Sequence, residues 1–385
     1  MPCLVVCSAA CSSDGHAVTS QSAGSPSTAG SASGAATSAG SGGSSLAGGP
    51  AANGGTSAVA GSSGQSAGGA NSGGANAGSA NAGSGGNEAG GGQAGGGTSA
   101  GSGGGPATTG SCPKTLPTLA GDNDTSFYAL RQDIPHGVVT TVQYKQGANK
   151  TMRVYTPPDY ETNAAATYPV LYINHGGGEN DSHWGCTNAN NCGYAGRILD
   201  NLLADGKAVP MVIAMPDTGD CANFNPPAPP DFADPCTTQY VNDFIPYVEK
   251  TYRVKADRHS RAIAGLSMGG LVTLNTGFGH LELFSHVFVY SSGYLADARP
   301  KWETNASSLL GDSKKTNGLL DAPVYLAAGA TDTALPNAQA VRDIFKKNDI
   351  AVLWQDSSKG HEWANWRRYL AQTLPLMFKN TSGCD

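Results

Sequence analysis

The stretch "SRAIAGLSMGGLV", residues 260–272, joins an apolar run, a glycine-rich turn and a second apolar run. Its centre, Gly265-Leu266-Ser267-Met268-Gly269, matches the pattern G-x-S-x-G, in which a serine lies on a sharp turn between a strand and a helix. The two flanking glycines permit the close backbone approach that such a turn requires. We therefore predict a buried strand that ends just before Ser267 and a helix that begins just after it.

Two other serines, Ser66 and Ser99, stand in the same pattern, which a chain with 54 glycines produces by chance. Both lie between residues 12 and 111, a segment made almost wholly of Gly, Ala, Ser, Thr and Asn, without Lys, Arg or aromatic residues. Such a segment buries too little apolar surface to offset the entropy of ordering it. We predict a disordered Gly/Ser/Ala-rich linker over residues 12–111, in which no serine can be held against a base.

From residue 112 to residue 385 the composition is that of one globular domain. Eight short apolar runs predict strands, at residues 137–144, 151–157, 168–175, 210–217, 260–265, 286–292, 322–329 and 350–356. Amphipathic stretches at 195–206, 238–252 and 337–349 predict helices between them. Strands that alternate with helices indicate crossover connections, so we expect an α/β fold of the α/β-hydrolase type with a mostly parallel central sheet flanked by helices.

Ligand sites in such sheets lie at the carboxyl ends of the strands, so candidate catalytic residues are those that directly follow a run. Ser267 needs a base to take its proton, and His361 follows the run at 350–356. Asp332 follows the run at 322–329 and completes the order of serine, acid and histidine along the chain. The alternatives are a helix-capping serine, a structural histidine and a turn aspartate.

The remaining candidates surround this predicted triad. We expect the amides of Met268, next to the nucleophile, and Gly177, in the loop "HGGG", to form an oxyanion hole. Trp184, His183 and Trp363 are candidate substrate-binding rings for a sugar or phenolic group, and Trp366 is a further candidate aromatic surface. The alternative for the tryptophans is that they pack in the core.

The cysteines and the first residues indicate export. Residues 1–11, "MPCLVVCSAAC", resemble the end of a secretory or lipoprotein signal with Cys11 as the lipidated residue; the alternative is an ordinary secretory signal remnant without a lipid. Six further cysteines favour disulfides. Proximity in sequence pairs Cys186 with Cys192 and Cys221 with Cys236, which leaves Cys112 for Cys384. The alternative of a zinc site is disfavoured because the chain has no C-x-x-C pair.

The motifs "HGGGEND", "GLSMGG", "GATD" and "GHEWANWR", in this order and spacing, resemble carbohydrate esterase family 1, whose α/β-hydrolase fold is esterase D-like. The resemblance covers about residues 136–379. It implies a serine carboxylesterase with Ser267, Asp332 and His361 as its triad and no metal or organic cofactor. It also implies feruloyl or acetyl esters of plant cell-wall polysaccharide as substrates.

Other functions remain open at this point. The same fold is typical of siderophore trilactone esterases and of cell-envelope acyltransferases, and a long linker also suits an inactive glycan-binding surface lipoprotein. The net charge of −6 argues against a nucleic-acid partner. We expect a monomer outside a bacterial cell or on its outer surface, with an ester-bearing polysaccharide or small phenolic ester as its partner and membrane contact only through a lipid on Cys11.

Overall fold

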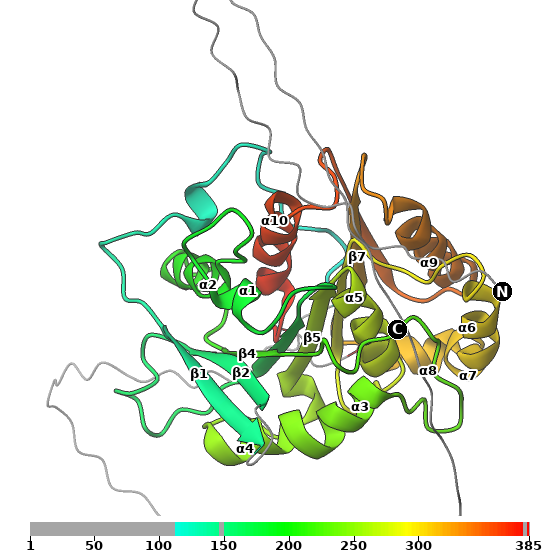
Figure 1. The fold of residues 1–385 in the computed structure, drawn as a ribbon, viewed down its shortest axis with the longest axis horizontal. Coiled ribbons are helices and arrows are strands. Elements are labelled where there is room, and N and C mark those ends of the chain that lie inside the picture. Colours follow the sequence, from blue (N-terminus) through cyan, green and yellow to red (C-terminus); the bar gives the residue numbers. More distant parts are fainter. Residues whose placement is uncertain (1–111, 146–149, 380–382, 385) are drawn as a thin grey trace, which may run out of the picture. The chain divides into compact units, whose positions relative to one another are not determined.

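The computed structural model describes residues 112–145, 150–379 and 383–384. The predicted signal remnant, the linker and Cys11 lie outside the described residues. The folded unit is an eight-stranded sheet with helices on both faces (Figure 1). This is the α/β-hydrolase architecture that the alternation of strands and helices predicted.

The strands follow the predicted runs to within two residues at each end. They are β1 (Val138–Lys145), β2 (Lys150–Thr156), β3 (Val170–Asn174), β4 (Val212–Pro216), β5 (Arg261–Leu266), β6 (His286–Tyr290), β7 (Val324–Gly329) and β8 (Val352–Ser357). Their order in the sheet is β1-β2-β4-β3-β5-β6-β7-β8. The pairs β1–β2 and β2–β4 are antiparallel, and every later pair is parallel. The predicted mostly parallel sheet is therefore confirmed.

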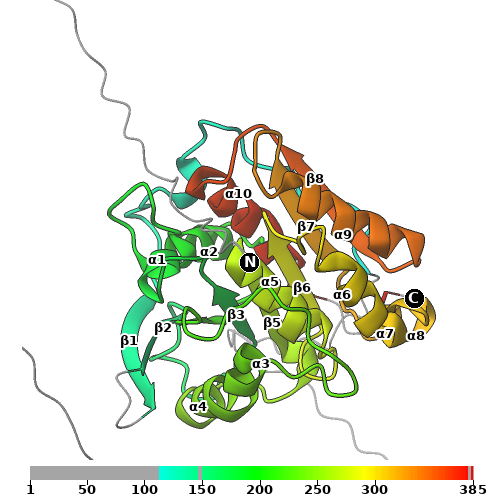
Figure 2. The ribbon, with the colours of Figure 1, turned by 45° about the vertical axis from the view of Figure 1, so that its right-hand side comes forward.

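Strands β3, β4, β5, β6 and β7 are buried at every residue. Continuous apolar strands are typical of a parallel sheet that is covered on both faces. Two separate apolar clusters lie on the two faces, one with Phe244 and Phe345 and the other with Ile198 and Tyr369. The sheet is thus the middle of three layers (Figure 2).

The helices divide between the two faces (Figures 1 and 2). The first helices and turns are η1 (Ser126–Tyr128), α1 (Ser182–Gly185), α2 (Ala195–Ala204), α3 (Pro235–Gln239), η2 (Tyr240–Phe244), α4 (Ile245–Thr251), η3 (Arg258–Ser260), α5 (Met268–Val272) and η4 (Thr273–Phe278). The later ones are α6 (Arg299–Asn305), α7 (Ser307–Leu310), α8 (Ser313–Gly318), α9 (Leu335–Lys347), α10 (Trp363–Thr373) and η5 (Leu374–Leu376). Residues of α2 and α10 belong to one apolar cluster, and residues of α4, α5 and α9 belong to the other.

Three disulfides join the cysteines that the sequence paired: Cys112–Cys384, Cys186–Cys192 and Cys221–Cys236. The first joins residues 272 positions apart, at the start and the end of the folded domain. Because all six cysteines of the described part are bonded to one another, none is available to a zinc ion. Disulfides are typical of proteins that fold in an oxidising compartment.

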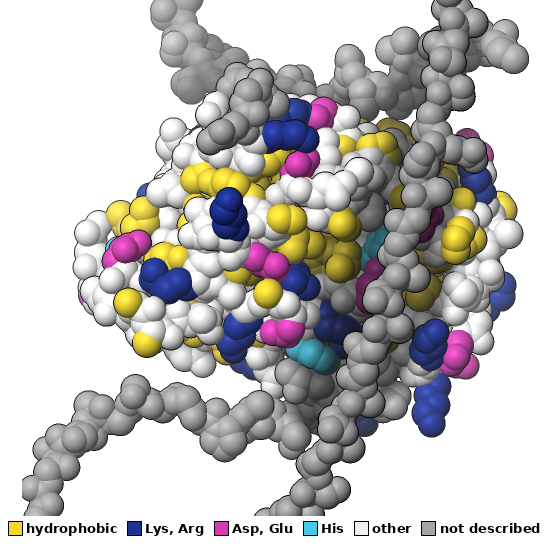
Figure 3. All heavy atoms as spheres, turned by 90° about the horizontal axis from the view of Figure 1, so that it is seen from below, with side chains coloured by type: hydrophobic (Ala, Val, Ile, Leu, Met, Phe, Trp, Pro, Cys, Tyr) yellow, Lys and Arg dark blue, Asp and Glu magenta, His cyan; other side chains and the backbone are white. Residues whose placement is uncertain are grey.

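The surface carries charges of both signs. On the face in Figure 3, the described Lys and Arg side chains lie among acidic and apolar ones and do not form a continuous basic patch. Within the described ranges, the helices are all too short or too polar to cross a membrane.

Candidate active site

Ser267 lies on the turn between β5 and α5, as the sequence predicted. Its backbone has φ +52° and ψ −119°, a conformation that residues other than glycine rarely adopt. A Cβ atom on Gly265 would lie 2.7 Å from Thr273 Oγ1 and would overlap the Gly269 carbonyl. The glycines therefore let the strand and the helix approach closely, and the turn raises Ser267 to a half-buried position at the carboxyl end of β5.

Replacing Gly269 with Ala is expected to lower the free energy of unfolding by about 3 kcal/mol, the upper range for overpacking. The added methyl would lie 2.7 Å from the Asn174 carbonyl oxygen and would overlap that of His175. Both are backbone atoms at the end of β3, which is paired with β5, so neither can move cheaply. Urea unfolding of the variant measures the loss.

Gly318→Ala is the matched control. Gly318 ends α8, and a Cβ atom there would meet nothing within 4 Å. This variant should be as stable as the unchanged protein or slightly more stable, because alanine loses less backbone entropy on folding. Equal stability of the two variants would contradict the close approach of Gly269 to β3.

The structure brings His361 and Asp332 to Ser267 from two other strand ends. His361 Nε2 lies 2.8 Å from Ser267 Oγ, and His361 Nδ1 lies 2.8 Å from Asp332 Oδ1. Asp332 follows β7, and His361 precedes α10 in the loop after β8. The three side chains thus form one hydrogen-bonded row at the carboxyl edge of the sheet.

Asp332 and His361 differ in burial, as their two places in this hydrogen-bonded row require. The Asp332 side chain is fully buried, whereas that of His361 is 28% exposed and can meet a ligand. Burial acts to raise the pKa of Asp332, but its interactions with His361 and Ser291 and the backbone amide of Ala334 outweigh burial and lower the pKa. The Ala334 amide donates to Asp332 Oδ1 at 2.8 Å. Asp332 is therefore an ionised carboxylate near neutral pH, suited to hold a proton on His361 Nδ1.

The loop after β3 lies against the turn that holds Ser267. A Cβ atom on Gly176 would lie 3.5 Å from Ser267 Cβ, and one on Gly177 would lie 4.0 Å from Met268 Cβ. The Gly176 amide already donates to Glu179 Oε2 at 2.8 Å. Gly177 is therefore the better candidate of the two for a free amide facing the site.

The three predicted substrate-binding rings occupy one aromatic cluster beside this loop. The His183 ring stacks parallel to that of Trp363, with centroids 6.3 Å apart, and is itself half-buried. Trp184 is only 1% exposed, and its Nε1 donates to the Asn174 carbonyl oxygen at 3.0 Å. The prediction that Trp184 contacts substrate is therefore wrong: the ring packs at 5.0 Å edge-on under Trp363. Trp363 is 7% exposed, so little of its side chain can meet a ligand.

Three further residues contact this row or its loop; sequence reasoning missed Glu179 and Ser291 and offered Trp366 only as an aromatic surface for substrate. Glu179 accepts hydrogen bonds from the Gly176 amide and from Trp363 Nε1. Trp366 packs edge-on to the His361 ring at 5.0 Å and donates to Ser291 Oγ at 3.0 Å. Ser291 follows β6, so the rule that sites gather at carboxyl ends of strands would have found it. Glu179 also follows a strand, β3, and stands in the motif "HGGGEND", but neither fact indicates its two hydrogen-bond partners.

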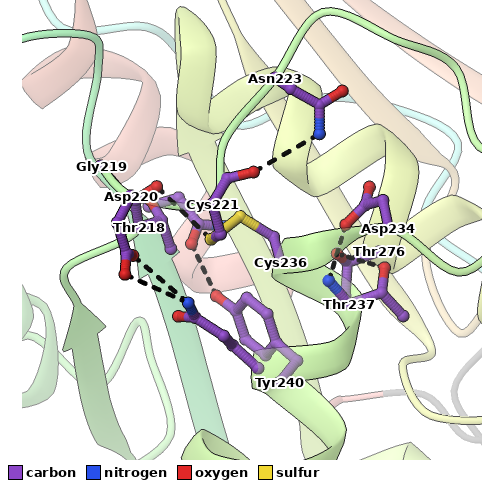
Figure 4. Close-up of a disulfide and its surroundings, with 12 residues drawn as sticks. Thr218, Gly219, Asp220, Cys221, Asn223, Asp234, Cys236, Thr237, Tyr240 and Thr276 are labelled. Atoms are coloured by element: carbon purple, nitrogen blue, oxygen red, sulfur yellow. Dashed lines mark hydrogen bonds between the residues drawn. A yellow bond between two sulfur atoms is a disulfide. The ribbon is translucent and has the colours of Figure 1, made fainter. Parts of the chain in front are cut away.

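The segment between Asp217 and Cys236 begins at the carboxyl end of β4, beside the loop after β3. The Thr218 amide donates to His175 Nε2 at 3.1 Å. The Cys221–Cys236 disulfide closes the segment against α3 (Figure 4), where Asp234 accepts from the Thr237 amide at 2.7 Å and caps the helix. The segment is thus fixed at both ends next to the site.

The comparisons with known proteins agree with this arrangement. The model of the Esterase family, described as "Putative esterase", matches residues 145–377. An endo-1,4-beta-xylanase/feruloyl esterase of Xylanibacter ruminicola is 31% identical over 272 residues, which cover 66% of this chain and 33% of the relative. The endo-1,4-beta-xylanase Y of Acetivibrio thermocellus is 25% identical over 60% of this chain and 22% of its own.

The chain thus spans a third or less of the length of these curated relatives. A solved structure of a ferulic acid esterase matches with a TM-score of 0.53 and 26% identity, covering 64% of this chain and all of that one. The family model covers more than half of the chain, including all eight strands except most of β1. The chain therefore belongs to the Esterase family, and its fold is like that of carbohydrate esterase family 1.

Proposed function

We propose that the protein is a serine carboxylesterase with Ser267 as nucleophile, His361 as general base and Asp332 as the acid that orients His361. The observation that carries this proposal is the row of two 2.8 Å contacts from Ser267 Oγ to His361 and from His361 to Asp332. Nucleophile, base and orienting group within hydrogen-bond reach are the arrangement that serine acyl transfer requires.

The reaction proceeds through an acyl-enzyme. His361 Nε2 takes the Ser267 proton as Oγ attacks the ester carbonyl, and the amides of Met268 and Gly177 bind the oxygen that becomes negative. His361 then gives this proton to the departing alkoxide, and the alcohol leaves. Water next loses a proton to His361 and attacks the acyl-enzyme, which releases the acid and restores the Ser267 hydroxyl. Asp332 stabilises the charged imidazole in both halves.

We assign the substrates to feruloyl or acetyl esters on plant cell-wall polysaccharide. Two observations support this assignment: the relatives named feruloyl esterase and ferulic acid esterase, and the stacked rings of His183 and Trp363 beside the site. A half-buried ring next to the triad suits the flat face of a phenolic acyl group or a sugar. The disulfide-closed segment from Asp217 to Cys236 would form one wall of the site.

Export fits the same assignment, because polysaccharide esters are met outside the cell. The three disulfides support folding in an oxidising compartment. We propose that residues 12–111 tether the esterase domain, with Cys11 as the attachment point for a lipid. The intact mass of the protein from a membrane fraction tests the lipid.

A substrate panel tests the function. Methyl ferulate, acetylated xylan and short nitrophenyl esters should be hydrolysed to free acid, with methyl ferulate or acetylated xylan preferred. Cleavage of a siderophore trilactone alone would overturn the cell-wall assignment. Transfer of the acyl group to a glycan would indicate an acyltransferase. Binding of glycan without turnover, and without labelling of Ser267 by a fluorophosphonate, would indicate an inactive binding protein.

A further inference from the structure

The carboxylate of Glu179 is shared between two donors from distant parts of the chain. Its Oε2 accepts from the Gly176 amide at 2.8 Å, and its Oε1 accepts from Trp363 Nε1 at 2.9 Å. Gly176 lies in the loop after β3, and Trp363 begins α10, two residues after His361. One side chain thus ties the loop that faces the nucleophile turn to the helix that follows the base.

The contact with Gly176 is reciprocal and closes a turn. The Glu179 amide donates to the Gly176 carbonyl oxygen at 3.3 Å, while the Glu179 carboxylate accepts from the Gly176 amide. Gly178 in this turn has φ +77°, which favours glycine. Gly177 stands between these fixed points, so the position of its amide depends on both hydrogen bonds.

The other end of Glu179 is held by a rigid ring. Trp363 packs against His183, Trp184 and Trp366, with ring centroids 6.3, 5.0 and 5.2 Å away. Trp366 in turn contacts His361. A donor whose side chain is fixed by packing in this way holds its acceptor in place.

We propose that Glu179 is a positioning residue that sets the oxyanion loop against the catalytic row. By occupying the Gly176 amide and anchoring to Trp363, it leaves the Gly177 amide directed at the developing oxyanion. This inference rests on the proposed function, since it concerns the same reaction. Glu179 does not contact Ser267 or His361 among the contacts of the described residues, so it acts through the loop and takes no proton.

The test is a double-mutant cycle of Glu179→Gln and Trp363→Phe. Glutamine keeps one acceptor oxygen, so it can hold Gly176 or Trp363 but not both; phenylalanine keeps a ring and removes the Nε1 donor. Each variant should lower kcat about tenfold to a hundredfold, because a displaced Gly177 amide no longer stabilises the oxyanion fully. KM should change less than about threefold. The double variant should be no slower than the slower single variant, because both remove the same tie.

A second readout separates positioning from mere stability. A trifluoromethyl ketone that forms a tetrahedral adduct with Ser267 should bind more weakly to each variant, in proportion to the loss in kcat/KM. Binding of the free acid product should stay unchanged. All rates are taken per site titrated with a fluorophosphonate, so a partly unfolded sample does not count as a slow enzyme.

Two matched controls lie away from the loop. Glu161→Gln makes the same change at an exposed glutamate. Trp354→Phe removes an Nε1 donor that also has a carboxylate partner, Asp356, at 2.8 Å on β8. Both should keep the wild-type kcat.

The proposal is overturned if Glu179→Gln and Trp363→Phe keep the wild-type kcat, if their effects multiply in the double variant, or if the affinity for the ketone does not fall. These outcomes leave the wild-type enzyme active and labelled at Ser267. Failure of the proposed function itself would instead show as a wild-type protein that neither turns over esters nor accepts the fluorophosphonate. The two failures are therefore distinguishable.

Discussion

Ser267→Ala is expected to lower kcat for ester hydrolysis by about 10⁶-fold, close to the background rate. The alanine has no oxygen to form the acyl-enzyme, while the turn, the oxyanion amides and His361 remain in place. The loss should appear in kcat rather than in KM, because Ser267 acts on the reacting carbon and contributes little to holding the substrate. Any residual rate would come from the oxyanion amides and binding alone.

The chain supplies its own control for this substitution. Ser66 stands in the same G-x-S-x-G pattern, within the predicted linker. Ser66→Ala should therefore keep the wild-type kcat on methyl ferulate, and a fluorophosphonate should label both Ser66→Ala and the unchanged protein, but not Ser267→Ala. Turnover of Ser267→Ala within tenfold of wild type, or labelling at another serine, would refute the assignment of the nucleophile.

The comparison of these serines shows what a pattern can and cannot predict. The letters G-x-S-x-G occur three times, and within the described part of the chain Ser267 follows a run of buried residues and precedes a helix, as predicted. Parallel strands place their carboxyl ends at one edge, so residues far apart in sequence meet there. The same rule found Asp332 and His361, which the structure brings within 2.8 Å contacts of the row.

Side-chain packing around the site could not be predicted in the same way. The sequence offers Trp184 as an aromatic residue beside a glycine-rich loop, but its burial depends on α1 folding onto the sheet beneath α10. Strand and helix periodicity assign no face to a residue in a four-residue helix. The sequence therefore could not distinguish Trp184 from Trp363, although the structure leaves 1% of the first and 7% of the second exposed.

The contacts of Glu179 could not be predicted from the sequence for a related reason. Its two partners are a backbone amide three residues away and an indole 184 residues away. Neither contact leaves a trace in composition or spacing, and a lone glutamate in a loop is usually solvated. Only the structure shows that the Gly176 amide is occupied, which is also the observation that favours Gly177 over its neighbour as an oxyanion donor.

Asp332→Asn is expected to lower kcat by about 10⁴-fold while the fold is kept. The Asp332 carboxylate accepts from His361 Nδ1 and so leaves Nε2 unprotonated toward Ser267. Asp332 Oδ1 accepts from both the Ala334 amide and His361 Nδ1, so the asparagine oxygen can keep both contacts but carries no negative charge. The charged imidazole that forms when His361 takes the Ser267 proton then loses its stabilisation. Rates on methyl ferulate, taken per titrated site, measure the loss.

Another buried aspartate of the structure, Asp321, contacts a histidine, and this contact makes a strict control for the argument. His259 Nδ1 lies 2.7 Å from Asp321 Oδ2, and Asp321 is 1% exposed. This pair precedes β5 and β7, at the opposite end of the strands from Ser267. Asp321→Asn should therefore lower the melting temperature but keep the wild-type kcat per titrated site, whereas Asp332→Asn should lose kcat. If both variants lose kcat equally, the effect is one of stability; if Asp332→Asn keeps kcat within tenfold, another group must orient His361. A loss of kcat confined to Asp332→Asn would follow only from the place of Asp332 in the catalytic row.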